Sequence, residues 1–288
     1  MRLILLLILL TYSLFAFGIE VSNTTIANGK TALLEFQKER GISYEKIVIG
    51  KKKYKIFENP VDKKKAYVLL PISYYEKPKE KKVKILYEES DRQKSTTMLF
   101  HIEDGKYKKE TIKVNNSKVT LSKKDKKRAS KEYAEAMKIY KTISNQSYIT
   151  KNFIVPLNSK ITSSFGKARV YNNTLKGYHS GTDFRAKVGT PLTACNDGLV
   201  VLAKDRFYSG GSVIIDHGQG IYSCYYHMSK FDVKKGTVVK RGDIVGLSGE
   251  SGRVTGPHLH FSFRVGGEQV DPLQLIELIN KNLLKAVK

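Results

Sequence analysis

Short β-branched and aromatic segments recur along most of this chain, and they restrict its fold more than any other feature. No helical period runs through residues 19–120. The expected strands there are 47–49, 54–57, 66–72, 83–87, 98–102 and 111–114. Short strands separated by turn residues are typical of a small antiparallel sandwich. From residue 153 glycine stands at nearly every junction, and the expected strands are 199–203, 212–216, 221–226, 238–239, 244–247 and 259–265. Because no helix there could serve as a parallel crossover, we predict a mainly β fold with antiparallel sheets in both halves.

Two amphipathic helices are expected between and after these β regions. In residues 123–144 the apolar side chains fall on one face of a helix, and they are Ala129, Tyr133, Ala136, Met137 and Tyr140. This helix would connect the two halves and pack its apolar face on one of them. The second helix would follow Asp271 and Pro272, in the sequence LQLIELINKNLLKAV.

The N-terminal sequence MRLILLLILLTYSLFAFG combines one positive charge with an apolar run. The run is shorter than the roughly 20 residues that a membrane span needs, and it fits a signal peptide. Ala16 and Gly18 supply small residues for cleavage after Gly18, and an uncleaved N-terminal anchor is the alternative. We therefore predict an exported, periplasmic protein with no stable membrane span after cleavage. The expected division is a signal peptide at 1–18, an N-terminal β domain at 19–120, a helical connector at 121–152 and a C-terminal domain at 153–288.

The chain is strongly basic, with 51 Lys and Arg against 27 Asp and Glu and a net charge of +24. Lysine-rich runs lie at 51–53, 63–65, 77–84 and 123–128. No recognisable module joins a basic stripe to stacking aromatic residues, and export also argues against a nucleic-acid partner. The lysines either form solvated faces of the β domain or bring the N-terminal region to an anionic cell-wall or membrane surface.

Five of the six histidines lie in the C-terminal half, in spacings that suggest a metal site. His179 precedes Asp183 by four residues, so the two would share a face in extended chain, and His258 and His260 would share a face of a strand. A His–Asp pair with one more histidine gives three ligands that zinc accepts, and it leaves a fourth position for water. The two cysteines have no CxxC spacing. We expect Cys195 and Cys224 to be buried free thiols, with a disulfide between them as the alternative.

The order of these motifs resembles the lysostaphin/LytM-type zinc endopeptidases, which are peptidoglycan hydrolases. The resemblance covers about residues 153–280, and the wider order of export signal, β domain and helix is similar to Gram-negative members. The matching stretches are 161–166, 179–184, 189–191, 216–218, 225–227, 252–261 and 270–272.

The resemblance implies a role for each matching side chain. His179, Asp183 and His260 would bind one Zn²⁺ per chain. His227 and His258 would be catalytic, as general base or oxyanion partner, without a division between them. We expect His217 to serve in a turn or in packing. Three further side chains either line a substrate groove or belong to the scaffold, namely Tyr178, Arg169 and Arg253.

The resemblance also implies a substrate, peptidoglycan, and a reaction, cleavage of the D-Ala–diamino acid cross-link between stem peptides, which would remodel the cell wall and cell shape. The alternatives are a non-catalytic wall-binding or amidase-activating protein of the same fold, a peptidoglycan carboxypeptidase, and an endopeptidase for glycine-rich bridges. Loops 171–178 and 207–211 would carry the specificity. The N-terminal domain would position the enzyme, bind a partner or cover the groove.

Overall fold

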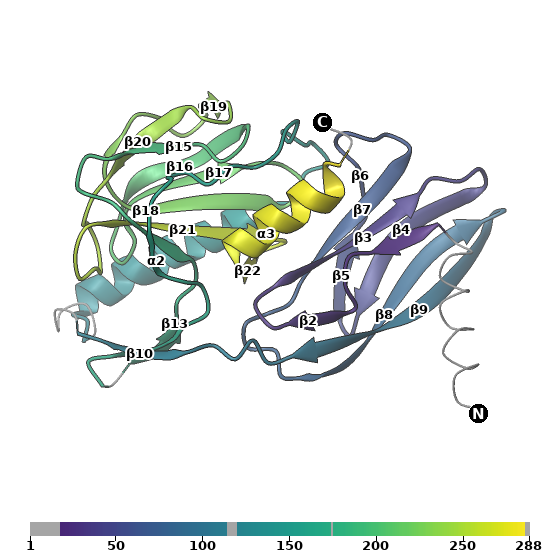
Figure 1. The fold of residues 1–288 in the computed structure, drawn as a ribbon, viewed down its shortest axis with the longest axis horizontal. Helices are drawn as coiled ribbons and strands as arrows, with labels where there is room; N and C mark the ends of the chain where they lie inside the picture. Colours follow the sequence, from purple (N-terminus) through teal and green to yellow (C-terminus); the bar gives the residue numbers. More distant parts are fainter. Residues whose placement is uncertain (1–17, 114–119, 174, 286–288) are drawn as a thin grey trace.

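The computed structural model describes residues 18–113, 120–173 and 175–285, and Figure 1 shows two β-rich regions side by side. The mainly β, antiparallel fold class that we predicted is confirmed. The expected signal peptide lies outside the described residues except for Gly18. Among the residues that are described, no helix is long and apolar enough to cross a membrane.

The N-terminal region is built from two sheets that face each other across an apolar core. Its four-stranded sheet has the order β1-β3-β7-β6, formed by Ile19–Val21, Thr31–Gln37, Lys65–Pro71 and Phe57–Glu58. Its five-stranded sheet has the order β2-β9-β8-β4-β5, formed by Thr25–Ala27, Arg92–Glu103, Lys79–Glu89, Ile42–Ile49 and Lys52–Lys55. Alternate side chains of β8 and β9 are buried, and Ile85 and Phe100 meet Leu34 and Leu70 of the other sheet in one core. Strands in which every second side chain is buried favour such a sandwich of two sheets.

The C-terminal region is dominated by a ten-stranded sheet. Its main path is β11-β14-β21-β18-β17-β16-β19, formed by Ile161–Ser163, Thr182–Arg185, His258–Val265, Ile221–Phe231, Gly210–Asp216, Gly198–Arg206 and Val238–Val239. Three more strands extend it, namely β15 (Pro191–Thr193), β20 (Ile244–Ser248) and β22 (Glu268–Val270). Leu259, Phe261 and Phe263 project from one face of β21 into the core, together with Leu275 of α3. The opposite face of β21 is therefore left for polar side chains.

Both expected helices are present. Helix α2 (Lys123–Tyr140) begins at Ser122, whose side chain accepts a hydrogen bond from the Asp125 amide. Helix α3 (Pro272–Leu278) begins after the capping carboxylate of Asp271 and continues as a π-helical turn, Ile279–Leu283. Ala136 and Tyr140 of α2 are buried against the sheet, but Tyr133, which we expected on the buried face, is 63% exposed. The buried residues of α2 thus lie in its C-terminal half, and a cavity lined in part by Tyr133 lies beside the helix.

The strand that we expected at 111–114 pairs with a different part of the chain than the prediction assumed. Strand β10 (Lys109–Ile112) runs parallel to β12 (Ala168–Tyr171), which pairs in turn with β13 (Leu175–Tyr178). Residue 114 lies outside the described part. Local composition predicted a strand but not its partner, because parallel pairing joins segments that are distant in sequence. As a result β10 lies against the C-terminal region instead of in the N-terminal sandwich.

The two regions share contacts along a broad face. Leu33, Tyr67 and Leu69 belong to the same apolar cluster as the core of the C-terminal sheet. The Gln274 side chain of α3 forms hydrogen bonds with both the amide and the carbonyl of Thr31. Beyond this cluster, several tyrosines also meet across the boundary, and the rings of Tyr74 and Tyr178 stack at 3.8 Å between centroids.

Candidate metal centre

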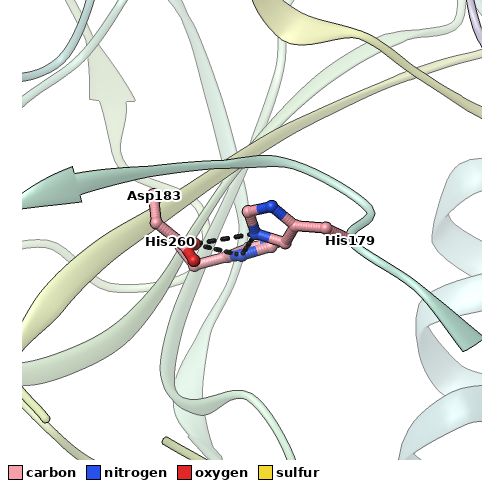
Figure 2. Close-up of side chains that lie close together, drawn as sticks. All are labelled: His179, Asp183 and His260. Carbon is pink, nitrogen blue, oxygen red and sulfur yellow. Dashed lines mark hydrogen bonds and ion pairs between the residues drawn. The ribbon is translucent and has the colours of Figure 1, made fainter. Parts of the chain in front are cut away.

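His179, Asp183 and His260 converge at one buried point (Figure 2). Asp183 on β14 lies directly opposite His260 on β21, and His179 lies four residues before Asp183. Gly181 lies between His179 and Asp183 in the sequence. Glycine is needed there for the close approach to β21, because a Cβ would lie 2.4 Å from the Phe261 carbonyl oxygen and 2.7 Å from His260 Nε2. Short distances connect the three donor atoms: 2.9 Å from His179 Nε2 to Asp183 Oδ1, 3.0 Å from His179 Nε2 to His260 Nδ1, and 2.8 Å from His260 Nδ1 to Asp183 Oδ1.

The chemistry of these donors fits a zinc ion. Ligand atoms of tetrahedral zinc lie about 3.3 Å apart, as follows from zinc–ligand bonds of roughly 2.0–2.1 Å. His179 Nδ1 lies 2.8 Å from the Ser164 carbonyl oxygen, which accepts its proton and leaves the Nε2 lone pair for the centre. Two imidazoles and a carboxylate thus point electron pairs at one buried point, which favours a cation there. Burial alone would raise the pKa of Asp183, but hydrogen bonds with His179 and His260 hold this pKa well below its usual range.

A row of charges connects Asp183 to β10, in the segment between the two regions. Arg169 of β12 donates to Asp183 Oδ2 at 3.3 Å and to Glu110 Oε1 of β10 at 2.6 Å. Lys167 forms a second ion pair with Glu110 at 3.1 Å. The sequence left open whether Arg169 lines the groove or belongs to the scaffold. The structure places it in contact with the candidate ligand Asp183. Glu110 was missed, because nothing in its lysine-rich surroundings distinguishes it from a surface glutamate.

His227 and His258 lie beside the three candidate ligands. Their ring centroids are 4.8 Å apart, and His258 Nε2 lies 3.6 Å from Asp183 Oδ1. Each histidine has its Nδ1 at 2.8 Å from a backbone carbonyl, Ser251 for His227 and Gly256 for His258. Both rings can therefore offer Nε2 as a proton acceptor. Burial lowers the pKa of His227 to about 3, with further contributions from His260 and His258, so His227 is neutral near pH 7.

A groove of about 620 Å³ opens in front of this cluster. Strand β10 and residues 255–258 line it, and Arg169 and Asp183 also contribute. Two other candidate groove residues have different surroundings. Tyr178 stacks on Tyr74 of the N-terminal region. Arg253 lies between the rings of Tyr171 and Tyr208, at 4.3 and 4.5 Å from their centroids.

The remaining histidine and the two cysteines of this region lie in the protein interior. His217 is fully buried, with Nδ1 at 2.7 Å from the Asp197 carbonyl oxygen and Nε2 at 2.8 Å from the Ser223 hydroxyl. The expected packing role of His217 is confirmed, and burial lowers its pKa to about 4. Cys195 and Cys224 are buried free thiols, as expected.

Comparison with known proteins agrees with this geometry. The sequence model of Peptidase family M23 matches residues 177–272, a range that holds all five residues of the cluster. The peptidoglycan DD-endopeptidase ShyA of Vibrio cholerae is 43% identical over 122 residues, 41% of this chain and 28% of ShyA. The DD-carboxypeptidase/endopeptidase Mpg of Neisseria meningitidis is 37% identical over 97 residues, 34% of this chain and 22% of Mpg.

A solved structure extends the likeness over most of the chain. It is a Pseudomonas aeruginosa protein assigned to peptidase M23, with 26% identity and a TM-score of 0.65, and the match covers 87% of this chain and 94% of that chain. A buried group of two histidines and an aspartate within the matched residues is the ligand set expected of a metallopeptidase domain. Within that class, residues 177–272 match peptidase family M23, and the predicted resemblance to lysostaphin/LytM-type enzymes is confirmed. The chain spans less than a third of the length of the curated relatives named here.

Proposed function

We propose that this protein is a zinc-dependent peptidoglycan endopeptidase that cuts the D-Ala–diamino acid cross-link between stem peptides. The observation that carries the proposal is the convergence of His179, Asp183 and His260 beside two further histidines in an open groove. The names of ShyA and Mpg support peptidoglycan as the substrate.

In this proposal His179 Nε2, Asp183 Oδ1 and His260 Nδ1 hold the zinc ion. Zinc would supply a Lewis acid and a bound water of lowered pKa. The chain's own groups orient the ligands, because the Ser164 carbonyl fixes the His179 ring and Arg169 fixes the Asp183 carboxylate. The carbonyl acceptor raises the basicity of the His179 ring and fixes its orientation, and the arginine holds the carboxylate in place.

His227 and His258 are the groups that we propose to move protons. Each donates its Nδ1 proton to a carbonyl and presents Nε2 toward the site. A neutral imidazole in this position accepts a proton from the attacking water, and once protonated it stabilises an oxyanion or protonates the leaving amine. Both residues remain candidates for both roles.

We further propose that the protein is exported and acts in the periplasm, on the basis of the N-terminal apolar run and the wall-directed relatives. The lysine-rich N-terminal region would bring it to an anionic wall or membrane surface.

The test uses purified sacculi, added zinc and muropeptide analysis by mass spectrometry. An endopeptidase converts cross-linked dimers to uncrosslinked muropeptides, whereas a carboxypeptidase shortens stem peptides and leaves the dimers intact. A non-catalytic wall-binding protein releases nothing. The wild-type protein should carry one zinc ion by elemental analysis, and Asp183→Asn should lose both the zinc and the activity.

The matched control is Asp232→Asn, which removes an ion pair with Lys230 outside the site. It should keep both the zinc and the activity. Full activity in Asp183→Asn would contradict the assignment of Asp183 as a ligand.

A further inference from the structure

A second cavity lies between helix α2 and the sheet, on the sheet face that carries the candidate ligands. Side chains alternate along β21, so His260, Ser262 and Arg264 share one face, while the intervening residues point to the core. Opposite them on β18 lie Tyr226, Cys224 and Tyr222, in register. Helix α2 packs on this same face, and its Tyr140 hydroxyl lies 3.1 Å from the Tyr226 hydroxyl. The cavity beneath the helix has a volume of about 200 Å³.

Two arginines, Arg206 and Arg264, line this cavity, and neither has a carboxylate partner in the part of the chain that the structure describes. Arg206, at the end of β16, is only 9% exposed. One of its terminal nitrogens donates to the Glu132 carbonyl at 3.0 Å, and its Nε has no partner among the residues that the structure describes. Arg264 donates to the Gly267 carbonyl and to the Gln269 side chain, and its guanidinium lies 4.5 Å from the centroid of the Tyr140 ring.

The cavity lining includes an acidic side chain, Glu132, which is already engaged. Glu132 accepts hydrogen bonds from Arg128 and from the Phe207 amide. Within the described ranges the arginine ion pairs are those of Arg128 and Arg169, so neither cavity arginine has one. A buried guanidinium without a counter-charge costs free energy, which an anion in the cavity would recover.

The cavity is coupled directly to the candidate metal centre. The Tyr226 ring stacks on the His260 ring at 5.6 Å between centroids. Gln269, which Arg264 holds, donates to the carbonyl of Ser180, the residue after His179. Strand β16 lies three strand spacings from β21, which carries His260, or about 14 Å. That distance corresponds to roughly four residues of extended peptide.

We propose that this cavity is a carboxylate subsite in which Arg206, assisted by Arg264, binds a free carboxylate of the peptide that is cut. This inference rests on the proposed function, because it assigns one end of that substrate. The planar guanidinium matches a carboxylate in geometry as well as charge. A volume of about 200 Å³ accommodates a carboxylate with a small side chain. The exposed Tyr133 of α2 lies at the edge of the cavity, so the connector helix forms part of the binding site.

The test compares two synthetic cross-linked peptides that differ only in whether this carboxyl group is free or amidated. The wild-type, zinc-loaded protein should cleave the free acid with a kcat/KM about 10- to 100-fold higher, the range expected for a charge-assisted hydrogen bond in a buried site. Arg206→Gln should lower the value for the acid to that for the amide and leave the amide unchanged. Arg241→Gln, whose arginine donates to the Asn152 carbonyl away from the cavity, should keep the preference.

Two results would overturn the proposal. One is equal cleavage of acid and amide by the wild-type protein, which needs no variant. The other is an equal loss for both peptides in Arg206→Gln, because that pattern means a structural role for Arg206. If the wild-type protein cleaves neither peptide, the proposed function fails, and calorimetric titration with N-acetyl-D-alanyl-D-alanine and its amide then decides the subsite alone. Binding of the acid but not the amide, lost in Arg206→Gln, supports the subsite, and equal or absent binding of both refutes it.

Discussion

Replacing Glu110 by glutamine would test whether the segment between the two regions tunes the candidate metal centre. Glu110 accepts from Arg169 and pairs with Lys167, and Arg169 in turn donates to Asp183. Burial alone would raise the pKa of Glu110, but the hydrogen bonds from Arg169 and Lys167 outweigh it and lower this pKa. Glutamine keeps the shape but offers one acceptor oxygen and no charge, so at least one of the two cations loses its partner.

The size of the effect follows from the exposure of the groups. Hydrogen bonds to charged groups contribute roughly 1.5–3 kcal/mol, against about 1 kcal/mol for neutral ones. The Glu110 and Arg169 side chains are 24% and 14% exposed, so solvent screens their interaction in part. We therefore expect Glu110→Gln to lower the free energy of unfolding by about 1–2 kcal/mol. Changes behind a metal ligand typically weaken metal binding 10- to 100-fold, and because Glu110 acts through Arg169 we expect about 10-fold.

The assay is a competition titration of zinc against a chromophoric chelator, together with urea unfolding of the same samples. The control is Glu277→Gln, which breaks an exposed ion pair with Lys281 and should change neither quantity measurably. Unchanged zinc affinity in Glu110→Gln, with or without a loss of stability, would show that the row of charges does not influence the metal centre.

Two further predictions concern stability. Burial lowers the pKa of His217 to about 4, whereas the unfolded chain binds this proton near pH 6.5. The stability that neutral His217 contributes is therefore present above about pH 6.5 and lost toward pH 4, with about 2 kcal/mol lost between pH 7 and pH 5. Urea unfolding at both pH values should show a smaller decrease in stability for His217→Gln than for the wild-type protein. An identical decrease in the two proteins would contradict the reasoning. Tyr67→Phe removes the hydroxyl that donates to Gln219 across the buried boundary, which should cost about 1–3 kcal/mol, whereas Tyr75→Phe at a 72% exposed position should change little; similar losses in the two variants would refute a role for the buried hydrogen bond.

Most of the longer strands and both helices could be predicted from the sequence because each carries its period within one segment. Strand β21 is an example, because alternation along residues 259–265 predicted the strand and the shared face of His258 and His260. Strand β3 (Thr31–Gln37) was missed, because it is buried on both faces and shows no alternation. Strands β11 to β15 were not predicted, since elements of three or four residues are too short to establish a period. The pattern in α2 also overstated burial at Tyr133, because a helical period does not show which residues of the apolar face meet the neighbouring sheet.

Side chains whose roles depend on partners far away in the sequence could not be predicted. The motifs brought out His179, Asp183 and His260 because metal ligands need particular residue types in a recognisable order. Glu110 and Arg206 have no such signature. Glu110 depends on a parallel pairing between β10 and β12, and Arg206 on the packing of α2 over the sheet. Both arrangements are long-range, and a single sequence carries no direct record of them.

The apolar cluster that holds Leu33, Tyr67 and Leu69 together with Leu275 and Leu283 has a consequence for any opening motion of the molecule. Separating the two halves would expose apolar surface of both to water, and the hydrogen bonds between Gln274 and Thr31 would break at the same time. A boundary of this kind resists rigid-body movement of one half of the molecule against the other.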